Sequence, residues 1–288
     1  MVKKQAYFKN LRRSIFKSKA RFLSIFAIVL LGAAFFAGLR NTPLIMKETM
    51  DAYLDKHHRA DLTYLSSLGL SMEDINSLKD IEGIDQISYG YQFDALMSYK
   101  DKNLGITVYT NENYTDDMVN RPDLIKGHYP TLDNECLIDE VLNIEKDVQL
   151  NDVIRIHNDQ GEKNYKVVGI INDTRYISSM DRGTNTLGDG TNSGFIQVLT
   201  KGNENLALPT KLYDLRDEKI LYNQLSVTIK DAQDYNVFSE DYDDFIEDTN
   251  TKIKSTLSLR MSRLYEDISG DASDELEKAQ KDYDKGLK

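Results

Sequence analysis

Apolar residues form one unbroken run near the start of the chain, from Phe22 to Leu39. The run has 18 residues, carries no charge and has no polar side. As a helix it would measure roughly 27 Å at about 1.5 Å per residue, close to the ~30 Å hydrocarbon core of a bilayer. The pattern therefore predicts a transmembrane helix over residues 22–40. Its large apolar side chains are Phe22, Leu23, Ile25, Phe26, Ile28, Val29, Leu30, Leu31, Phe35, Phe36 and Leu39.

Two other interpretations of this run are weaker than a retained membrane anchor. A cleavable export signal has a shorter apolar stretch, of about 7–15 residues, and ends at a small-x-small site. Here the large residue Phe35 stands two positions before Ala37, where a cleavage site would have a small residue. A helix buried in a soluble core is less favoured still, because the run has no polar side.

An amphipathic pattern occupies residues 1–21, just before the run. Apolar side chains recur on one helical face, and Lys and Arg surround them, which predicts a basic helix lying in the membrane interface. This helix is either a topology signal alone or a contact for a cytoplasmic partner, and its periodicity does not decide between the two. The apolar face consists of Tyr7, Phe8, Leu11, Ile15 and Phe16.

Helical periodicity resumes after the run and predicts a stalk helix over residues 41–59 that continues the membrane helix. Thr42 and Pro43 are typical of a helix start, as an N-cap followed by proline at the first helical position. His57 and His58 lie near the end of the stalk. They form a poor metal site because adjacent helical residues point about 100° apart, and we interpret both as solvated side chains.

Alternating strand patterns and short helical patterns follow over residues 60–255, and they predict a domain of mixed α and β structure. A strand–helix–strand group comes first, then a mainly β region, then a helix from about Glu240. The predicted elements are strands over 60–67, 84–100 (bent at Gly90), 104–110, 194–200 and 223–231, a capped helix over 71–83, and a hairpin over 151–173 that turns at 158–161.

The last predicted part is a coiled-coil helix that starts in residues 256–288. Its apolar positions are separated by three or four residues in an eleven-residue repeat, which predicts a nearly straight coiled helix. Because the chain ends inside this pattern, we expect it to be the front part of a longer protein. The repeat positions are Met261, Leu264, Ile268, Ala272, Leu276, Ala279, Tyr283 and Leu287.

Residues 178–194 are rich in Gly, Asn, Thr and Asp and predict a mobile surface loop. Asp181 and Asp189 could in principle ligate calcium, but the ligand spacing of an EF-hand or of a glycine-rich nonapeptide repeat is absent. The role of this loop stays open.

Charge divides the chain sharply. Residues 1–21 hold eight basic residues and no acidic one, whereas the whole chain has a formal net charge of −11, so the remainder carries −19. The positive-inside rule then places the N-terminus in the cytoplasm and residues from 41 onward outside the cell membrane. The acidity of the outer part argues against nucleic acid as a partner.

Chemical motifs are absent from the sequence. It contains no nucleophile elbow, HExxH, paired-cysteine, phosphate-loop or dinucleotide motif, and its single cysteine, Cys136, excludes an internal disulfide. We therefore expect no catalytic residues, no metal site and no cofactor in this chain. A glycosidase without a motif would go unseen, since its two carboxylates can come from anywhere in the sequence.

Several segments stand in a characteristic order. They are "LRRSIFKSKARFLSIFAIVLLGAAFFAG", "HHRADLTYLSSLGLSMEDINSLKDIEGIDQI", "LIKGHYPTLDNECLIDEVL", "VQLNDVIRI", "NYKVVGIIND" and "RMSRLYEDISGDASDELEKAQKDYDKGLK". In this order they resemble the N-terminal part of ABC-transporter permeases of the FtsX/MacB type, and the last segment resembles the coiled-coil insert of large Gram-positive members. One departure is Asn151, which precedes Asp152 where that family has Gly.

The resemblance implies an α+β fold with one N-terminal transmembrane helix and a two-lobed extracytoplasmic domain. One lobe is an α/β sandwich, and the other is an inserted, mainly β lobe over about 104–215. The implied partners are a cytoplasmic ATPase subunit, which binds the ATP, a second permease copy or half, the lipid bilayer, and an extracellular substrate or protein of unknown identity. ATP-driven closure of the membrane helices would move the outer domain, to export a substrate or to switch an external partner.

Other functions remain open at this point. A ligand-sensing receptor domain and a membrane-anchored coiled-coil surface protein share the anchor and the mixed exterior, and an anchored enzyme is a further alternative. A sensor would have one more membrane helix before a cytoplasmic signalling module, whereas a permease would have at least three more. The substrate, the oligomeric state and the remaining membrane helices cannot be read from these residues.

Overall fold

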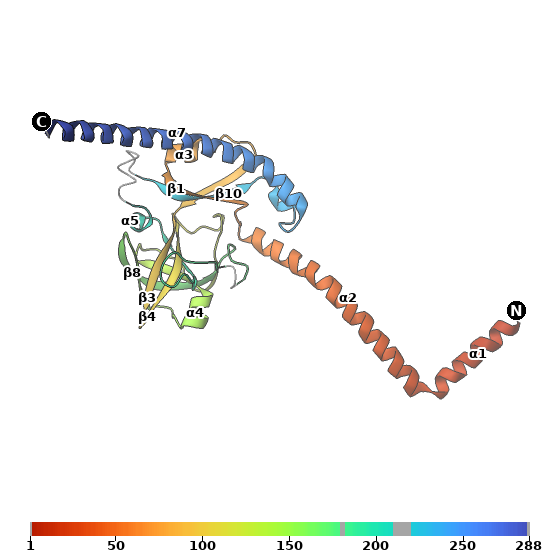
Figure 1. Cartoon of the computed structure of the whole chain (residues 1–288). Helices are drawn as coiled ribbons and strands as arrows, with labels where there is room; N and C mark the ends of the chain where they lie inside the picture. Colours follow the sequence, from red (N-terminus) through yellow and green to blue (C-terminus); the bar gives the residue numbers. More distant parts are fainter. Residues whose placement is uncertain (1, 179–181, 210–219, 287–288) are drawn as a thin grey trace. The chain divides into compact units, whose positions relative to one another are not determined.

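The computed structural model describes residues 2–178, 182–209 and 220–286, without the side chains of residues 2–5, 15, 267, 268 and 271–286. The chain forms two compact units, Met1–Ala52 and Tyr53–Lys288. Helices α1 (Val2–Lys17) and α2 (Lys19–Lys56) come first (Figure 1). In the described part of the chain, α2 is the one helix long and apolar enough to cross a membrane.

Helix α2 continues through Pro43 without a break, so the stalk continues the membrane helix as predicted, whereas the N-cap predicted at Thr42 is wrong. Proline has no N–H to donate to the preceding turn, which normally weakens a helix at this point. Pro43 leaves the carbonyl of Leu39 without its usual donor, and the Thr42 hydroxyl donates to the neighbouring carbonyl of Gly38 at 2.8 Å. The membrane helix and the predicted stalk are therefore one element.

A three-stranded antiparallel sheet has the order β1–β10–β2. Its strands are β1 (Leu62–Leu70), β2 (Ile84–Gly90) and β10 (Tyr222–Ile229). The short helix α3 (Met72–Asn76) begins with a capping box, in which Ser71 and Asp74 bond each other's backbone N–H. The predicted helix over 71–83 thus has the expected start but ends after five residues.

The long helix α7 (Glu240–Gly286) packs on this small sheet, as Figure 1 shows. Ile253 and Leu257 are buried in the cluster that α7 shares with the sheet. Arg260 adds a bond from its Nε to the Asp74 carboxylate at 2.7 Å. The predicted helix from about Glu240 is confirmed. Coiled-coil pairing over 256–288 stays a prediction, because the side chains of the repeat positions from Ile268 onward lie outside the described ones.

A second sheet closes into a barrel. Its order is β5–β8–β6–β9–β4–β3–β7, and β7 pairs in addition with β8, so the ring closes at β8, while β5 pairs with β8 alone among the described strands. Two of its pairings are parallel, β4 with β9 and β6 with β8. The strands are β3 (Gln92–Tyr99), β4 (Lys102–Asn111), β5 (Asp123–Gly127), β6 (Glu135–Asp139), β7 (Val153–Asn158), β8 (Gly161–Asn172) and β9 (Phe195–Leu199).

Apolar side chains fill the barrel, as the small diameter of a closed sheet requires. The buried cluster includes Met97, Ile106, Ile138, Ile156 and Val198. Besides α3, the described part of the chain has three further short helices: α4 (Glu140–Lys146), α5 (Glu204–Ala207) and the 3₁₀ helix η2 (Ala232–Asp234). The predicted α+β fold class is confirmed.

The predicted single strand over 84–100 is two strands in two different sheets. Gly90 approaches the backbone of Thr110 so closely that a Cβ there would lie 2.5 Å from the Thr110 oxygen. The chain crosses from one sheet to the other at the fully buried Tyr91. The barrel therefore begins at Gln92, earlier than the start near residue 104 that we expected for the inserted lobe.

The structure also shows the surroundings of Asn151 and of the segment 178–194. Asn151, in the place of the family's Gly, has φ +71°, a conformation that Asn tolerates better than most residues. Within 178–194, most described residues are exposed, as expected for a surface loop, but two are bonded to the barrel: buried Asn185 donates to the carbonyl of Ile106 at 2.9 Å, and Arg182 pairs with buried Asp139. Asp181 lies outside the described residues, and Asp189 accepts the backbone N–H of Thr191.

Candidate functional site: the junction after helix α2

The chain leaves α2 at Lys56 and enters β1 at Leu62 through a short turn, residues 57–61. His58 has φ +49°, the left-handed conformation that commonly ends a helix. The N–H of Arg59 then donates back to the carbonyl of Leu54 at 3.1 Å, and Leu54 is buried. We call this turn, together with the residues that bond to it, the junction. Its members are residues 57–61 and their partners Asn120, Arg121, Val227, Ile229 and Tyr242.

Backbone hydrogen bonds fasten the junction to the segment that precedes β5. The N–H of Asn120 donates to the carbonyl of His58 at 2.8 Å, and the N–H of Arg121 donates to that of His57 at 2.9 Å. In return, Nδ1 of His57 lies 3.0 Å from the carbonyl oxygen of Arg121. The turn is therefore bonded to the barrel region from both sides.

Asn120 adds a side-chain bond to the same junction. Its Oδ1 accepts the N–H of Ala60 at 2.8 Å and the hydroxyl of Thr174 at 3.4 Å. Asn120 is buried and has φ +53°. One side chain thus holds the turn and the chain beyond β8 together, in a conformation that favours Asn or Gly.

Asp61 ties the other end of the junction to the small sheet and to α7. Its N–H donates to the carbonyl of Val227 at 2.9 Å, while its carboxylate accepts the N–H of Ile229 at 2.7 Å and the hydroxyl of Tyr242 at 2.6 Å. Burial raises the pKa of Asp61, and these two donors oppose the rise. Tyr242 belongs to the first turns of α7, so the turn after α2 is bonded directly to the helix that leaves the domain.

His57 is the buried titratable group of the junction, with 2% of its surface exposed. Since Nδ1 faces a carbonyl oxygen, it carries the proton in the neutral ring, and Nε2 is left as an acceptor. In the described part of the chain Nε2 has no hydrogen-bond partner, and the nearest charge is the Asp123 carboxylate at 3.9 Å. Burial lowers the pKa of His57.

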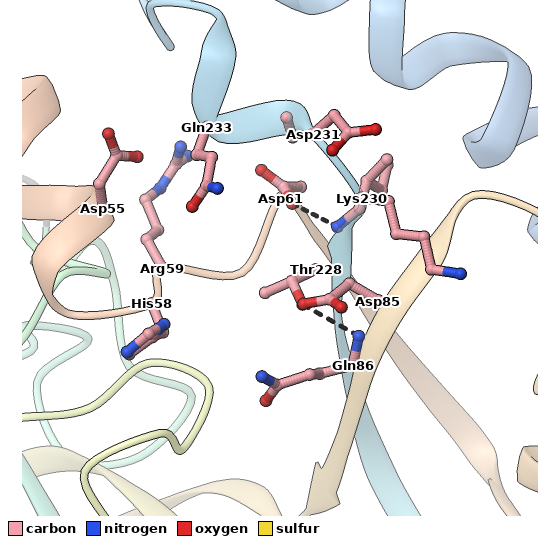
Figure 2. A pocket seen from close by; sticks show the side chains of 12 residues that line it. Asp55, His58, Arg59, Asp61, Asp85, Gln86, Thr228, Lys230, Asp231 and Gln233 are labelled. Atoms are coloured by element: carbon pink, nitrogen blue, oxygen red, sulfur yellow. Dashed lines mark hydrogen bonds between the residues drawn. The ribbon is translucent and has the colours of Figure 1, made fainter.

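A polar cleft of about 290 Å³ lies beside the junction (Figure 2). His58 and Arg59 stand on one side of it, Asp85 and Gln86 on the other, and Asp61 above them. Its lining mixes acidic and basic side chains, so no single ligand charge is favoured. Among the described residues, no group of three or more His, Cys, Asp or Glu could hold a metal ion.

The residues predicted from the sequence are not among those of the junction. The transmembrane residues Phe22 to Leu39 belong to α2, and the face that we expect to contact a cytoplasmic partner belongs to α1. Tyr7, Phe8, Leu11 and Phe16 are exposed, and the side chain of Ile15 lies outside the described ones. Their roles stay predictions.

Sequence reasoning missed the junction residues. His57 was expected to be solvated and is instead buried, because α2 ends at Lys56 and the next residues turn onto segment 119–123. Asn120, next to Arg121-Pro122, offered one usable signal, since Asn before a proline-containing turn often has a left-handed backbone. Asp61 and Tyr242 are 181 positions apart, and no periodicity links them.

No family model matches the chain. Among solved structures, it is similar to the extracellular domain of the ABC-type transporter YknZ from Gram-positive bacteria, with 15% identity, a TM-score of 0.39, and coverage of 69% of this chain and 93% of that one. It is also similar to the periplasmic region of MacB from Actinobacillus actinomycetemcomitans, with 13% identity, a TM-score of 0.37, and coverage of 66% and 75%. A permease domain from Porphyromonas gingivalis has 14% identity, a TM-score of 0.36, and coverage of 68% and 85%.

Proposed function

We propose that this chain is the N-terminal part of the membrane subunit of an ABC transporter. In this proposal α1 lies at the cytoplasmic membrane surface, residues 22–40 cross the membrane, and the two sheets lie outside the cell. A cytoplasmic ATPase subunit supplies the energy, and the exterior domain moves when the membrane helices close. The order of sequence segments and the strong charge difference across the span support this assignment.

The observation that carries the proposal is the junction. A domain that is merely tethered to a membrane needs only a flexible linker. Here residues 57–61 connect α2 to β1 through buried hydrogen bonds that reach the barrel region, the small sheet and α7. A displacement of the end of α2 would therefore be passed to all three parts rather than absorbed by the linker.

Co-purification tests the assignment. The full-length protein, extracted in mild detergent from its native cell, should carry an ATPase subunit with it. Changing Leu11→Gln and Ile15→Gln on the apolar face of α1 should weaken the association, because it removes apolar contact area. The matched control, Lys9→Gln with Arg13→Gln, alters the opposite face of the same helix and should retain the ATPase. A native preparation without any ATPase would contradict the proposal.

Motion of the exterior domain needs its own measurement. In the purified complex, hydrogen exchange of residues 57–61 and 119–123 should differ between the ATP-bound and nucleotide-free states. Exchange that is the same in both states, in a complex that hydrolyses ATP, would contradict the coupling through the junction while leaving the ATPase partnership intact.

A further inference from the structure

Strand β2 leaves one edge of the small sheet open. It pairs with β10 on one side, and no other described strand pairs with its second side. In an antiparallel ladder, about half of the backbone N–H and C=O groups of an edge strand point away from its partner. Apart from the ladder and the bond from Gln86 N–H to Thr228, no hydrogen bond in the described part of the chain reaches the backbone of residues 86–89.

A groove of about 250 Å³ runs along this open edge. One wall is four consecutive residues of β2, Gln86 to Tyr89, which span ~13 Å at about 3.3 Å per residue. The other wall is the segment 111–119 that follows β4. The groove is smaller than the ~300–1,000 Å³ typical of small-molecule pockets, so its length and its open backbone suit a chain rather than a compact ligand.

The charge of the groove indicates what kind of peptide would bind there. Glu112 and Asp117 are exposed on the far wall, and the lining contains no Lys, Arg or His. Neither carboxylate has a cation within 4 Å among the described residues, whereas their neighbour Asp116 is paired with Arg121. The pKa of Tyr89 is raised by burial and by the negative charge of Glu112, which places that carboxylate near the strand.

We infer that this groove binds an extended peptide segment that carries Lys or Arg, added as a fourth strand beside β2. The outward backbone groups of β2 would give the hydrogen bonds of the added strand, and Glu112 and Asp117 would receive its basic side chains. A second copy of this chain is a poor occupant, because pairing β2 with β2 would bring two acidic groove walls, each with Glu112 and Asp117, together. The inference does not depend on the ATPase partnership.

Binding of a defined probe tests the inference. The full chain is placed in uncharged phosphatidylcholine nanodiscs and titrated with a fluorescent octapeptide of alternating Lys and Thr, with empty nanodiscs as background. Removing both charges, Glu112→Gln with Asp117→Asn, should weaken binding by about two- to five-fold per charge at low salt. The control pair, Asp159→Asn with Glu162→Gln, lies at the exposed turn between β7 and β8 and should leave the affinity unchanged.

Two further measurements separate strand addition from simple charge attraction. The same peptide with N-methylated amides along one edge keeps its charges but loses its backbone donors, and it should bind at least ~10-fold more weakly. Hydrogen exchange of residues 85–90 should slow when the unmodified peptide is bound. Equal binding of the N-methylated peptide, or no binding of either, would overturn the inference.

Discussion

Asn120 gives the sharpest test of the junction, because one side chain carries two separable contributions. Replacing Asn120 by Gly removes the acceptor of the Ala60 N–H, and Ala60 is buried. An unsatisfied buried N–H costs about 1–3 kcal/mol. Replacing Asn120 by Ala adds the strain of a φ of +53° for a residue with a Cβ, about 1–2 kcal/mol more. We therefore expect losses in the free energy of unfolding of about 2 kcal/mol for Gly and about 3–4 kcal/mol for Ala.

Thermal unfolding followed by circular dichroism measures both losses in the full chain. For a domain of this size, about 2 kcal/mol corresponds to a decrease in Tm of about 4–8 °C. Asn120→Asp keeps an oxygen in the accepting position and serves as the control, with a smaller decrease. If Gly and Ala lowered Tm equally, the backbone-strain argument would be refuted, and if Gly had no effect, the Ala60 bond would not stabilise the junction.

Two more predictions concern the same region. Tyr242→Phe removes the donor to Asp61 and should lower the free energy of unfolding by about 1.5–3 kcal/mol, as expected for a hydrogen bond to a charged group. The control is Tyr265→Phe, which removes an exposed hydroxyl on the same helix and should lower the free energy of unfolding by less than about 0.5 kcal/mol. Equal effects of the two substitutions would contradict the role of Asp61. Burial lowers the pKa of His57 below its usual 6.5, so the stability that its neutral ring contributes is present above pH 6.5 and lost as the pH falls below it. Chemical denaturation between pH 7.5 and 5.5 should show this loss, His57→Gln should reduce it, and an unchanged pH dependence in that variant would contradict the assignment to His57.

Local sequence patterns predicted those elements whose structure is set by residues close to one another in the sequence. The apolar run of α2, the capping box at Ser71 and the hairpin of β7 and β8 all follow from short-range spacing. In that hairpin, Asn158 pairs with Gly161, at the predicted turn. Burial of one face and fixed turn chemistry decide such features, and both can be read from a few residues.

Elements that depend on distant partners were not predicted. Strand β6 has five residues and is held by a parallel partner on one side and an antiparallel one on the other. Of the division between β2 and β3, only a bend at Gly90 was predicted, because the strand pattern continues through Tyr91, whereas the close approach of Gly90 to Thr110 separates the sheets. The junction shows the same limit: the surroundings of His57 come from Arg121 and Asp123, far along the chain.

The strand order of the small sheet has a consequence for how the protein is made. Strands β1 and β2 touch each other only through β10, which begins at Tyr222, whereas all seven barrel strands lie between Gln92 and Leu199. Since synthesis proceeds from the N-terminus, the barrel has all of its strands while β1 and β2 still lack a partner. Ribosomal synthesis therefore delivers every strand of the larger sheet before β10, and until Tyr222–Ile229 is made, β1 and β2 lack the strand with which both of them pair.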